Sequence, residues 1–177
     1  MARADVLEAL EVDHVLSRAQ LRRHYRARRE VLEKLPSVTR TLVPVHMRSS
    51  SRVTLEFYGL NQRTLDRART SHLAHLAGTA ELRHVLGVPV SSWHAEARHG
   101  YDVCNPDAQW FREDGTVTAV EYDSGTYTFT DVTNKLLAFR EQGHHETIWG
   151  VVSRVRGDRL RLRSPEKLEV KVLNWWE

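Results

Sequence analysis

Three carboxylates stand at positions suited to metal-assisted chemistry on phosphates. Asp107 begins one expected strand, and Glu121 and Asp123 finish the next, with a tight Asp-Gly turn between the two strands. Strand residues two apart point to the same face, so the three side chains can converge at one end of the hairpin. Such a cluster is repulsive unless a hard cation sits among the oxygens, and Mg²⁺ or Mn²⁺ bound by carboxylates suits phosphate chemistry. The spacing therefore predicts a divalent cation that polarises a phosphate and activates a water.

Two other interpretations of these residues stay open. Asp123-Ser124-Gly125 would form a simple turn, with Glu121 facing solvent on its strand. The fold would otherwise keep a decayed site and bind DNA or protein without cleaving it. Against the simple turn, two acids directly follow an apolar strand, where burial of a charge is expensive.

The elements expected around the acids form an α/β layer. The strands 107–112 and 116–122 are followed by a helix over 129–141, which carries Lys135, and by a strand over 147–153. A short helix capped by Ser91 or Ser92 precedes the hairpin and contains Glu96. The last strand is expected over 168–176, at the edge of the sheet.

The N-terminal part predicts a DNA-binding module. Helices are expected over 4–14, from a capping box of Ser17 and Gln20, and over 26–35, followed by a hairpin of 39–47 and 52–58. Three helices and a hairpin are the order of a winged helix-turn-helix. The basic residues that would face DNA are Arg22, Arg23, Arg26, Arg28, Arg29, Lys34, Arg48 and Arg52. The alternative is that these residues form the solvated face of an ordinary helical hairpin.

The charge distribution supports a nucleic-acid partner. Residues 1–90 hold 15 basic and 9 acidic residues, a net charge of +6, whereas residues 91–177 hold 11 and 14, a net charge of −3. Counterion release from DNA favours clustered arginines. An acidic module beside a DNA-binding one would repel DNA unless cations intervene, which again points to a metal.

The predicted fold class is α+β, with the winged helix over 1–60, a connecting helix over 61–90 and an α/β domain over 91–177. No apolar run approaches the roughly 20 residues that a membrane span needs, so no membrane partner is expected. The single Cys104 excludes an internal disulfide, and a reducing cytoplasm is the expected location.

The acidic motif resembles known nucleases. Pro106-Asp107 and Glu121 are similar to the PD-(D/E)xK superfamily, although its lysine position holds Asp123. The segment Glu121-Tyr-Asp-Ser-Gly-Thr126, followed by Lys135, is similar to the Glu-x-Asp-x-Gly-Thr motif and helical lysine of the replication-relaxation family. The segments Tyr58-Gly-Leu-Asn and His72-Leu-Ala-His-Leu also look similar to that family. The resemblance covers roughly residues 5–155.

The resemblance implies a winged helix joined to a PD-(D/E)xK-like domain. Asp107 and Glu121 would be metal ligands, Asp123 a further ligand or a structural acid, and Lys135 the substitute for the missing catalytic lysine. Glu96 would complete the metal shell. The implied function is a Mg²⁺- or Mn²⁺-dependent endodeoxyribonuclease in plasmid or mobile-element replication, relaxation or mobilisation, with a relaxase or a replication initiator as partner. The competing class is a non-catalytic DNA-binding regulator or accessory protein.

Two further groups of residues allow more than one interpretation. Five arginines recur through 154–163, and if this stretch is a strand they form either a second phosphate-tracking surface or a charged, solvated edge. His72 and His75 are three residues apart on an expected helix, a spacing that zinc ligands also use. No cysteine pair or carboxylate stands at ligand spacing from them, so the zinc interpretation is the weaker one.

Overall fold

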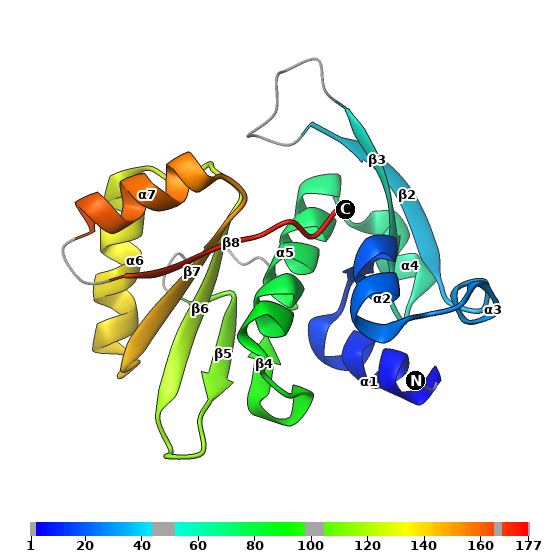
Figure 1. The fold of residues 1–177 in the computed structure, drawn as a ribbon, viewed down its shortest axis with the longest axis horizontal. Coiled ribbons are helices and arrows are strands. Elements are labelled where there is room, and N and C mark those ends of the chain that lie inside the picture. The colour runs from blue at the N-terminus through cyan, green and yellow to red at the C-terminus, as the bar shows by residue number, and fades with distance from the viewer. Residues whose placement is uncertain (1–2, 44–51, 98–104, 165–167, 177) are drawn as a thin grey trace.

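The computed structural model describes residues 3–43, 52–97, 105–164 and 168–176, and it has the expected α+β class (Figure 1). The first sheet is antiparallel, with strand order β1-β3-β2. Its elements follow in the order α1 (Arg3–Asp13), β1 (Leu16–Ser17), α2 (Arg18–Tyr25), α3 (Arg29–Leu32), β2 (Ser37–Leu42) and β3 (Val53–Tyr58).

The second sheet has five strands in the order β4-β5-β6-β7-β8. Strands β4, β5 and β6 are antiparallel neighbours, whereas β6, β7 and β8 run parallel. The remaining elements are α4 (Gln62–Arg67), α5 (Thr70–Leu86), the 3₁₀ turn η1 (Val90–Ser92), β4 (Trp93–Ala95), β5 (Ala108–Phe111), β6 (Val117–Asp123), α6 (Phe129–Glu141), β7 (Glu146–Val151), α7 (Arg154–Arg163) and β8 (Glu169–Val172).

Helix α2 begins at a capping box and ends at a residue with left-handed backbone geometry. The Ser17 hydroxyl accepts from the backbone N–H of Gln20, and the Gln20 side-chain oxygen accepts from the backbone N–H of Ser17. These two bonds confirm the predicted capping box. Arg26 ends the helix in the left-handed region, with φ of 50°. The third helix predicted over 26–35 is therefore wrong in extent: α3 is a single turn, and no side chain caps its start.

Helix α5 lies between the two sheets and packs on both (Figure 1). The predicted connecting helix over 61–90 is two abutting helices, because Ala68 leaves helical geometry between α4 and α5, and α5 ends at Leu86. One hydrophobic core joins Phe57 and Leu73 to Val120 and Trp175, which come from both ends of the chain. The predicted division into 1–60, 61–90 and 91–177 stays a prediction.

Gly78 explains how closely α5 approaches β6. A Cβ built at this position would lie 2.3 Å from the ring of Tyr122, so no larger residue fits without moving the strand or the ring. The glycine that weakens the helical pattern in the sequence is thus a packing requirement. It sets the distance between α5 and the strand that carries Glu121.

Helices α6 and α7 cover the opposite face of the large sheet, away from α5 (Figure 1). A second capping box, formed by Thr128 and Asp131, starts α6. The interpretation of 154–163 as a strand is wrong, because α7 is capped by Ser153 and buries Gly157 and Leu160. Its arginines point around the helix and do not form one strand face. The three-residue step between Arg156 and Arg159 had already broken a two-residue period.

The predicted edge strand near the C-terminus is confirmed in part, since β8 pairs with β7 over Glu169–Val172 and has no strand on its other side. In the part of the chain that the structure describes, no helix is long and apolar enough to cross a membrane.

Candidate functional site

The carboxyl end of β6 gathers the charged residues that form the candidate site. Asp107 directly precedes β5, which pairs with β6, and its Oδ2 accepts from the backbone N–H of Tyr122 at 2.8 Å. Glu121 lies beside Trp149 in the parallel register of β6 and β7. Asp107, Glu121 and Lys135, named here the strand-end cluster, are all buried. The hairpin thus brings the two acids to one place, as the sequence predicted.

Helix α6 brings Lys135 to this cluster. Its Nζ lies 2.8 Å from Glu121 Oε1, and both side chains are almost fully shielded from solvent. The ammonium also lies 5.3 Å from the ring centre of Tyr127 and 5.5 Å from that of Phe139. The helical lysine therefore reaches the acids at the end of β6.

Glu121 is the least satisfied charge in the cluster. Neither of its oxygens makes a well-aligned hydrogen bond with a described residue, although Lys135 and Tyr127 flank it. Burial, followed by the nearby charge of Asp107, raises the pKa of Glu121 well above its ordinary value. Burial and the Glu121 charge also raise the pKa of the Tyr127 phenol. This carboxyl therefore has capacity for a further cationic ligand.

Asp107 is held from the other side of the sheet by helix α5. Nε2 of His75 lies 2.9 Å from its Oδ1. Burial acts to raise the pKa of Asp107, but His75 and the Tyr122 N–H outweigh it and hold the pKa below its ordinary value. These contacts stabilise the ionised form of Asp107 and give its carboxylate a defined orientation.

Asp123 is held by partners of its own. Its Oδ2 accepts from Arg156 Nη2 at 2.7 Å and Nε at 3.0 Å, and its Oδ1 accepts from the Gly125 N–H at 2.6 Å. Arg156 also donates to the Tyr127 carbonyl at 2.7 Å. These are the contacts of a structural acid that ties α7 and the segment after β6 to the strand end.

Glu96 does not join the cluster. The short helix expected to contain it is wrong, because the turn η1 ends at Ser92 and Trp93–Ala95 form strand β4. Glu96 follows this strand with its side chain half exposed. Its nearest charged partner is His94 at 3.8 Å, and only its backbone N–H contacts Asp107, at the carbonyl. Within the described ranges, no three His, Cys, Asp or Glu side chains form a group that could hold a metal ion.

The donor chemistry of the remaining acids nevertheless suits a hard cation. Asp107 and Glu121 present carboxylate oxygens close enough that the charge of one raises the pKa of the other. The Glu121 oxygens are buried and poorly satisfied. A Mg²⁺ or Mn²⁺ ion takes carboxylate oxygens and relieves such repulsion. These two side chains are the ones that would hold it.

The basic residues predicted to face DNA divide into two groups. Arg22, Arg26, Arg28, Lys34 and Arg52 are exposed. Two others are engaged within the protein: Arg29 pairs with Glu33 at 2.5 Å, and Arg23 lies 3.5 Å from Glu81 and donates to the Asn174 carbonyl at 2.9 Å. Arg48 lies outside the described residues.

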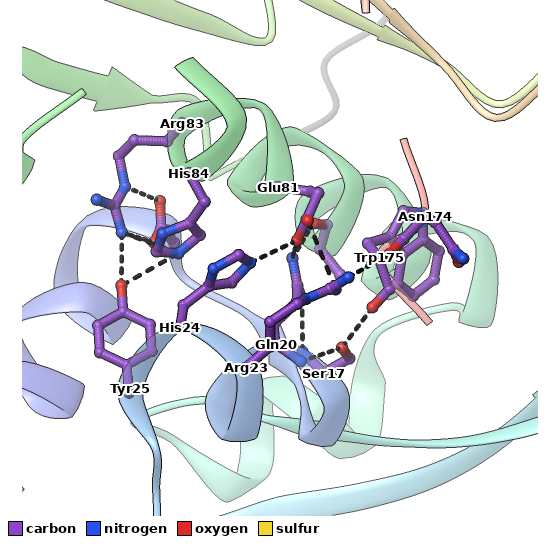
Figure 2. A network of polar contacts seen from close by, with 12 residues as sticks. Ser17, Gln20, Arg23, His24, Tyr25, Glu81, Arg83, His84, Asn174 and Trp175 are labelled. Atoms are coloured by element: carbon purple, nitrogen blue, oxygen red, sulfur yellow. Dashed lines mark hydrogen bonds and ion pairs between the residues drawn. The ribbon is translucent and has the colours of Figure 1, made fainter. Parts of the chain in front are cut away.

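A separate polar network fastens α2 to α5 and to the C-terminal segment (Figure 2). The Glu81 carboxylate of α5 accepts from Gln20 Nε2 at 3.0 Å, and His24 Nε2 lies 3.1 Å from the same oxygen. Arg83 donates to both oxygens of Asp13, at 2.9 and 2.6 Å, and to the Tyr25 hydroxyl at 2.7 Å. The residues Ser17, Gln20, Arg23, His24, Tyr25, Glu81, Arg83, His84 and Asp13, with the backbone of Asn174 and Trp175, are named here the α2–α5 network.

The comparisons with known proteins add no relative. A scan against protein-family models, a search of curated proteins and a search of solved structures found no match for the chain.

Two site residues were missed by the sequence reasoning. His75 was weighed only as a zinc ligand, and Arg156 only as part of a basic strand. Their contacts, to Asp107 and to Asp123, join residues 32 and 33 positions apart, respectively, and depend on how helices pack on the sheet. The available signal was the excess of buried acids, since each buried carboxylate needs a cationic partner.

Proposed function

We propose that the chain binds DNA and that its α/β half hydrolyses phosphodiester bonds with the help of Mg²⁺ or Mn²⁺. The observation that carries the proposal is the convergence of Asp107, Glu121 and Lys135 at the end of β6, where Lys135 Nζ lies 2.8 Å from Glu121. Two acids can hold a divalent cation, and the lysine would take the role that the resemblance to PD-(D/E)xK nucleases implies for it. From the resemblance, the setting would be replication, relaxation or mobilisation of a plasmid or mobile element, with a relaxase or replication initiator as partner.

The topology supports this proposal. Strands β5 and β6, helix α6 and the parallel strand β7 follow in the order strand, strand, helix, strand that was expected from the sequence, with the acids on the central hairpin. In the N-terminal half, α1, β1, α2, α3, β2 and β3 form a sheet of order β1-β3-β2, which supports a winged helix despite the single-turn α3.

Each residue of the cluster has a role that follows from its contacts. A cation bound by Asp107 and Glu121 would polarise the phosphate and lower the pKa of a water. Lys135 carries a fixed positive charge at Glu121, where it can stabilise negative charge on the phosphate oxygens. His75 acts through Asp107, because its contact at 2.9 Å fixes the orientation of that carboxylate.

A second candidate is a DNA-binding protein without hydrolytic activity. The specific observation in its favour is that both oxygens of Asp107 and both oxygens of Asp123 are already engaged by protein groups. In this alternative Lys135 and His75 replace the cation permanently, and the cluster only holds α5 and α6 on the sheet.

Cleavage assays separate the two candidates. The full chain is incubated with supercoiled plasmid and with single-stranded DNA, in Mn²⁺, Mg²⁺ or EDTA. Glu121→Gln and Lys135→Met each lower the cleavage rate by roughly 100-fold or more, the scale of losing one charge-stabilising group. Glu113→Gln, at an exposed acid in the β5–β6 turn, is the matched control and cleaves like the wild type.

Metal-dependent cleavage that is equally fast in the Glu121→Gln protein would contradict the proposal. DNA binding without cleavage in any metal would favour the second candidate.

A further inference from the structure

Three arginines at the junction of α4 and α5 are exposed and have no partner in the described parts of the chain. Arg63 and Arg67 lie one turn apart on α4, and Arg69 stands directly before α5. None of their side chains makes a hydrogen bond or an ion pair with a described residue, unlike those of Arg23 and Arg29 of the predicted DNA-facing set. Arg63, Arg67 and Arg69 are named here the α4 patch.

The patch is carried by a well-anchored helix. Leu65 is buried in the shared core, and the Asn61 side chain caps the start of α4. Arg40 of β2 donates to the Asp66 carbonyl at 3.2 Å. The Asp66 carboxylate, the acid nearest in sequence to the patch, accepts from Gln62 at 2.9 Å. The arginines are therefore presented on a fixed surface with an excess of positive charge.

The α4 patch lies at the start of the helix that contacts Asp107 of the strand-end cluster. Helix α5 begins directly after Arg69, and His75, which contacts Asp107 at 2.9 Å, follows six residues later. At 1.5 Å of rise per residue this is about 9 Å along the helix axis. In contrast, α2 is fastened to later residues of the same helix, from Ala77 to His84. The patch is thus at the end of α5 that leads to the cluster.

We infer that the α4 patch binds the phosphate backbone of DNA and leads it toward Asp107 and Glu121. Charge complementarity selects this occupant, since unpaired arginines bind phosphates by releasing counterions. The distance of about 9 Å along the helix axis from Arg69 to His75 corresponds to two or three base pairs, at a rise of about 3.4 Å per base pair. The inference rests on the proposed function and adds to it a DNA path that crosses the α4–α5 junction.

Equilibrium binding with a salt series tests the inference. The full chain is titrated against a fluorescent DNA duplex, and anisotropy gives Kd at several salt concentrations. Arg63→Ala with Arg67→Ala weakens binding and reduces the slope of log K against log salt by about 1.8, because each lost phosphate contact removes about 0.9. Arg154→Ala with Arg159→Ala removes the same charge from exposed positions of α7 and leaves Kd and slope unchanged.

The outcomes separate this inference from the proposed function. A wild-type Kd and slope in the Arg63→Ala/Arg67→Ala protein would overturn the α4 patch even where Mn²⁺-dependent cleavage is present. Loss of binding in that protein, with no cleavage by the wild type, supports the patch and rejects hydrolysis. No DNA binding by the wild-type chain would overturn both. Capture of an acidic peptide in place of DNA would assign the patch to a protein partner and also overturn the inference.

Discussion

The strand-end cluster and the α2–α5 network both bury charged side chains, but they satisfy them differently. In the network, Glu81 accepts hydrogen bonds from Gln20 and His24, and Arg83 donates to Asp13, Tyr25 and the Val88 carbonyl. In the cluster, Glu121 forms an ion pair with Lys135, whose Nζ lies 2.8 Å from its Oε1, but neither of its oxygens makes a well-aligned hydrogen bond with a described residue. A network that is satisfied internally serves the fold, whereas an acid left short of partners marks a place for a ligand.

Arg83→Met tests most strongly whether the α2–α5 network stabilises the fold. The substitution leaves Asp13 buried without its bidentate partner, and an uncompensated buried charge costs about 3–5 kcal/mol of the free energy of unfolding. Urea denaturation measures the loss. Arg154→Met, at an exposed position, is the control and changes stability by less than about 0.5 kcal/mol. A loss below about 1 kcal/mol in the Arg83→Met protein would mean that the network does not hold the fold together.

The next effect is a pH dependence that belongs to the network. Burial, followed by the charges of Arg83, His24 and Arg23, lowers the pKa of His84 to about 2 from its ordinary 6.5. The unfolded chain takes up a proton below pH 6.5, whereas the folded chain does not. The stability contributed by neutral His84 is therefore complete above pH 6.5 and is lost as the pH falls toward 2, by up to about 1.4 kcal/mol per pH unit.

His84→Asn removes this dependence. Free energies of unfolding measured between pH 7 and pH 4 should fall less steeply for the His84→Asn protein than for the wild type. Carboxylates titrate in both proteins, so the comparison isolates the histidine. Parallel curves would show that His84 already takes up its proton in the folded chain.

The smallest effect on stability is expected in the strand-end cluster. Glu121→Gln together with Lys135→Met replaces a buried ion pair by neutral side chains, which is often neutral or stabilising. Glu121→Gln alone leaves the Lys135 ammonium without its partner and should be less stable than the double variant. Thermal unfolding of both proteins checks this order. A double variant that loses more than about 2 kcal/mol would place the cluster with the structural network.

The local elements of this fold were readable from the sequence, whereas their contacts were not. The capping box of Ser17 and Gln20 and the hairpin with its Asp-Gly turn depend on residues near one another in the chain, and both are present. The hairpin and its strand alternation predicted that Asp107, Glu121 and Asp123 converge, and Asp107 and Glu121 do lie together. The third helix starts later than predicted because Arg26 has a left-handed backbone conformation, which a non-glycine residue adopts only in a particular context.

The rest of the site depends on packing over long sequence separations. Asp123 was grouped with the metal ligands because it shares a strand face with Glu121. Instead, Nε and Nη2 of Arg156 both donate to its carboxylate, and Arg156 lies on a helix that had been interpreted as a strand. His75 reaches Asp107 only because Gly78 lets α5 approach β6. A single sequence does not reveal which residues of α5 and α7 contact which strands of the sheet.

Mn²⁺ binding by the strand-end cluster tests the central claim most directly. Isothermal titration calorimetry of the full chain with Mn²⁺, in the absence of DNA, should detect one site that depends on Asp107 and Glu121. The Glu121→Gln protein should lose this site, whereas Glu113→Gln should keep it. No Mn²⁺ binding by the wild type, or equal binding by the Glu121→Gln protein, would contradict the account and leave the cluster as a structural ion pair.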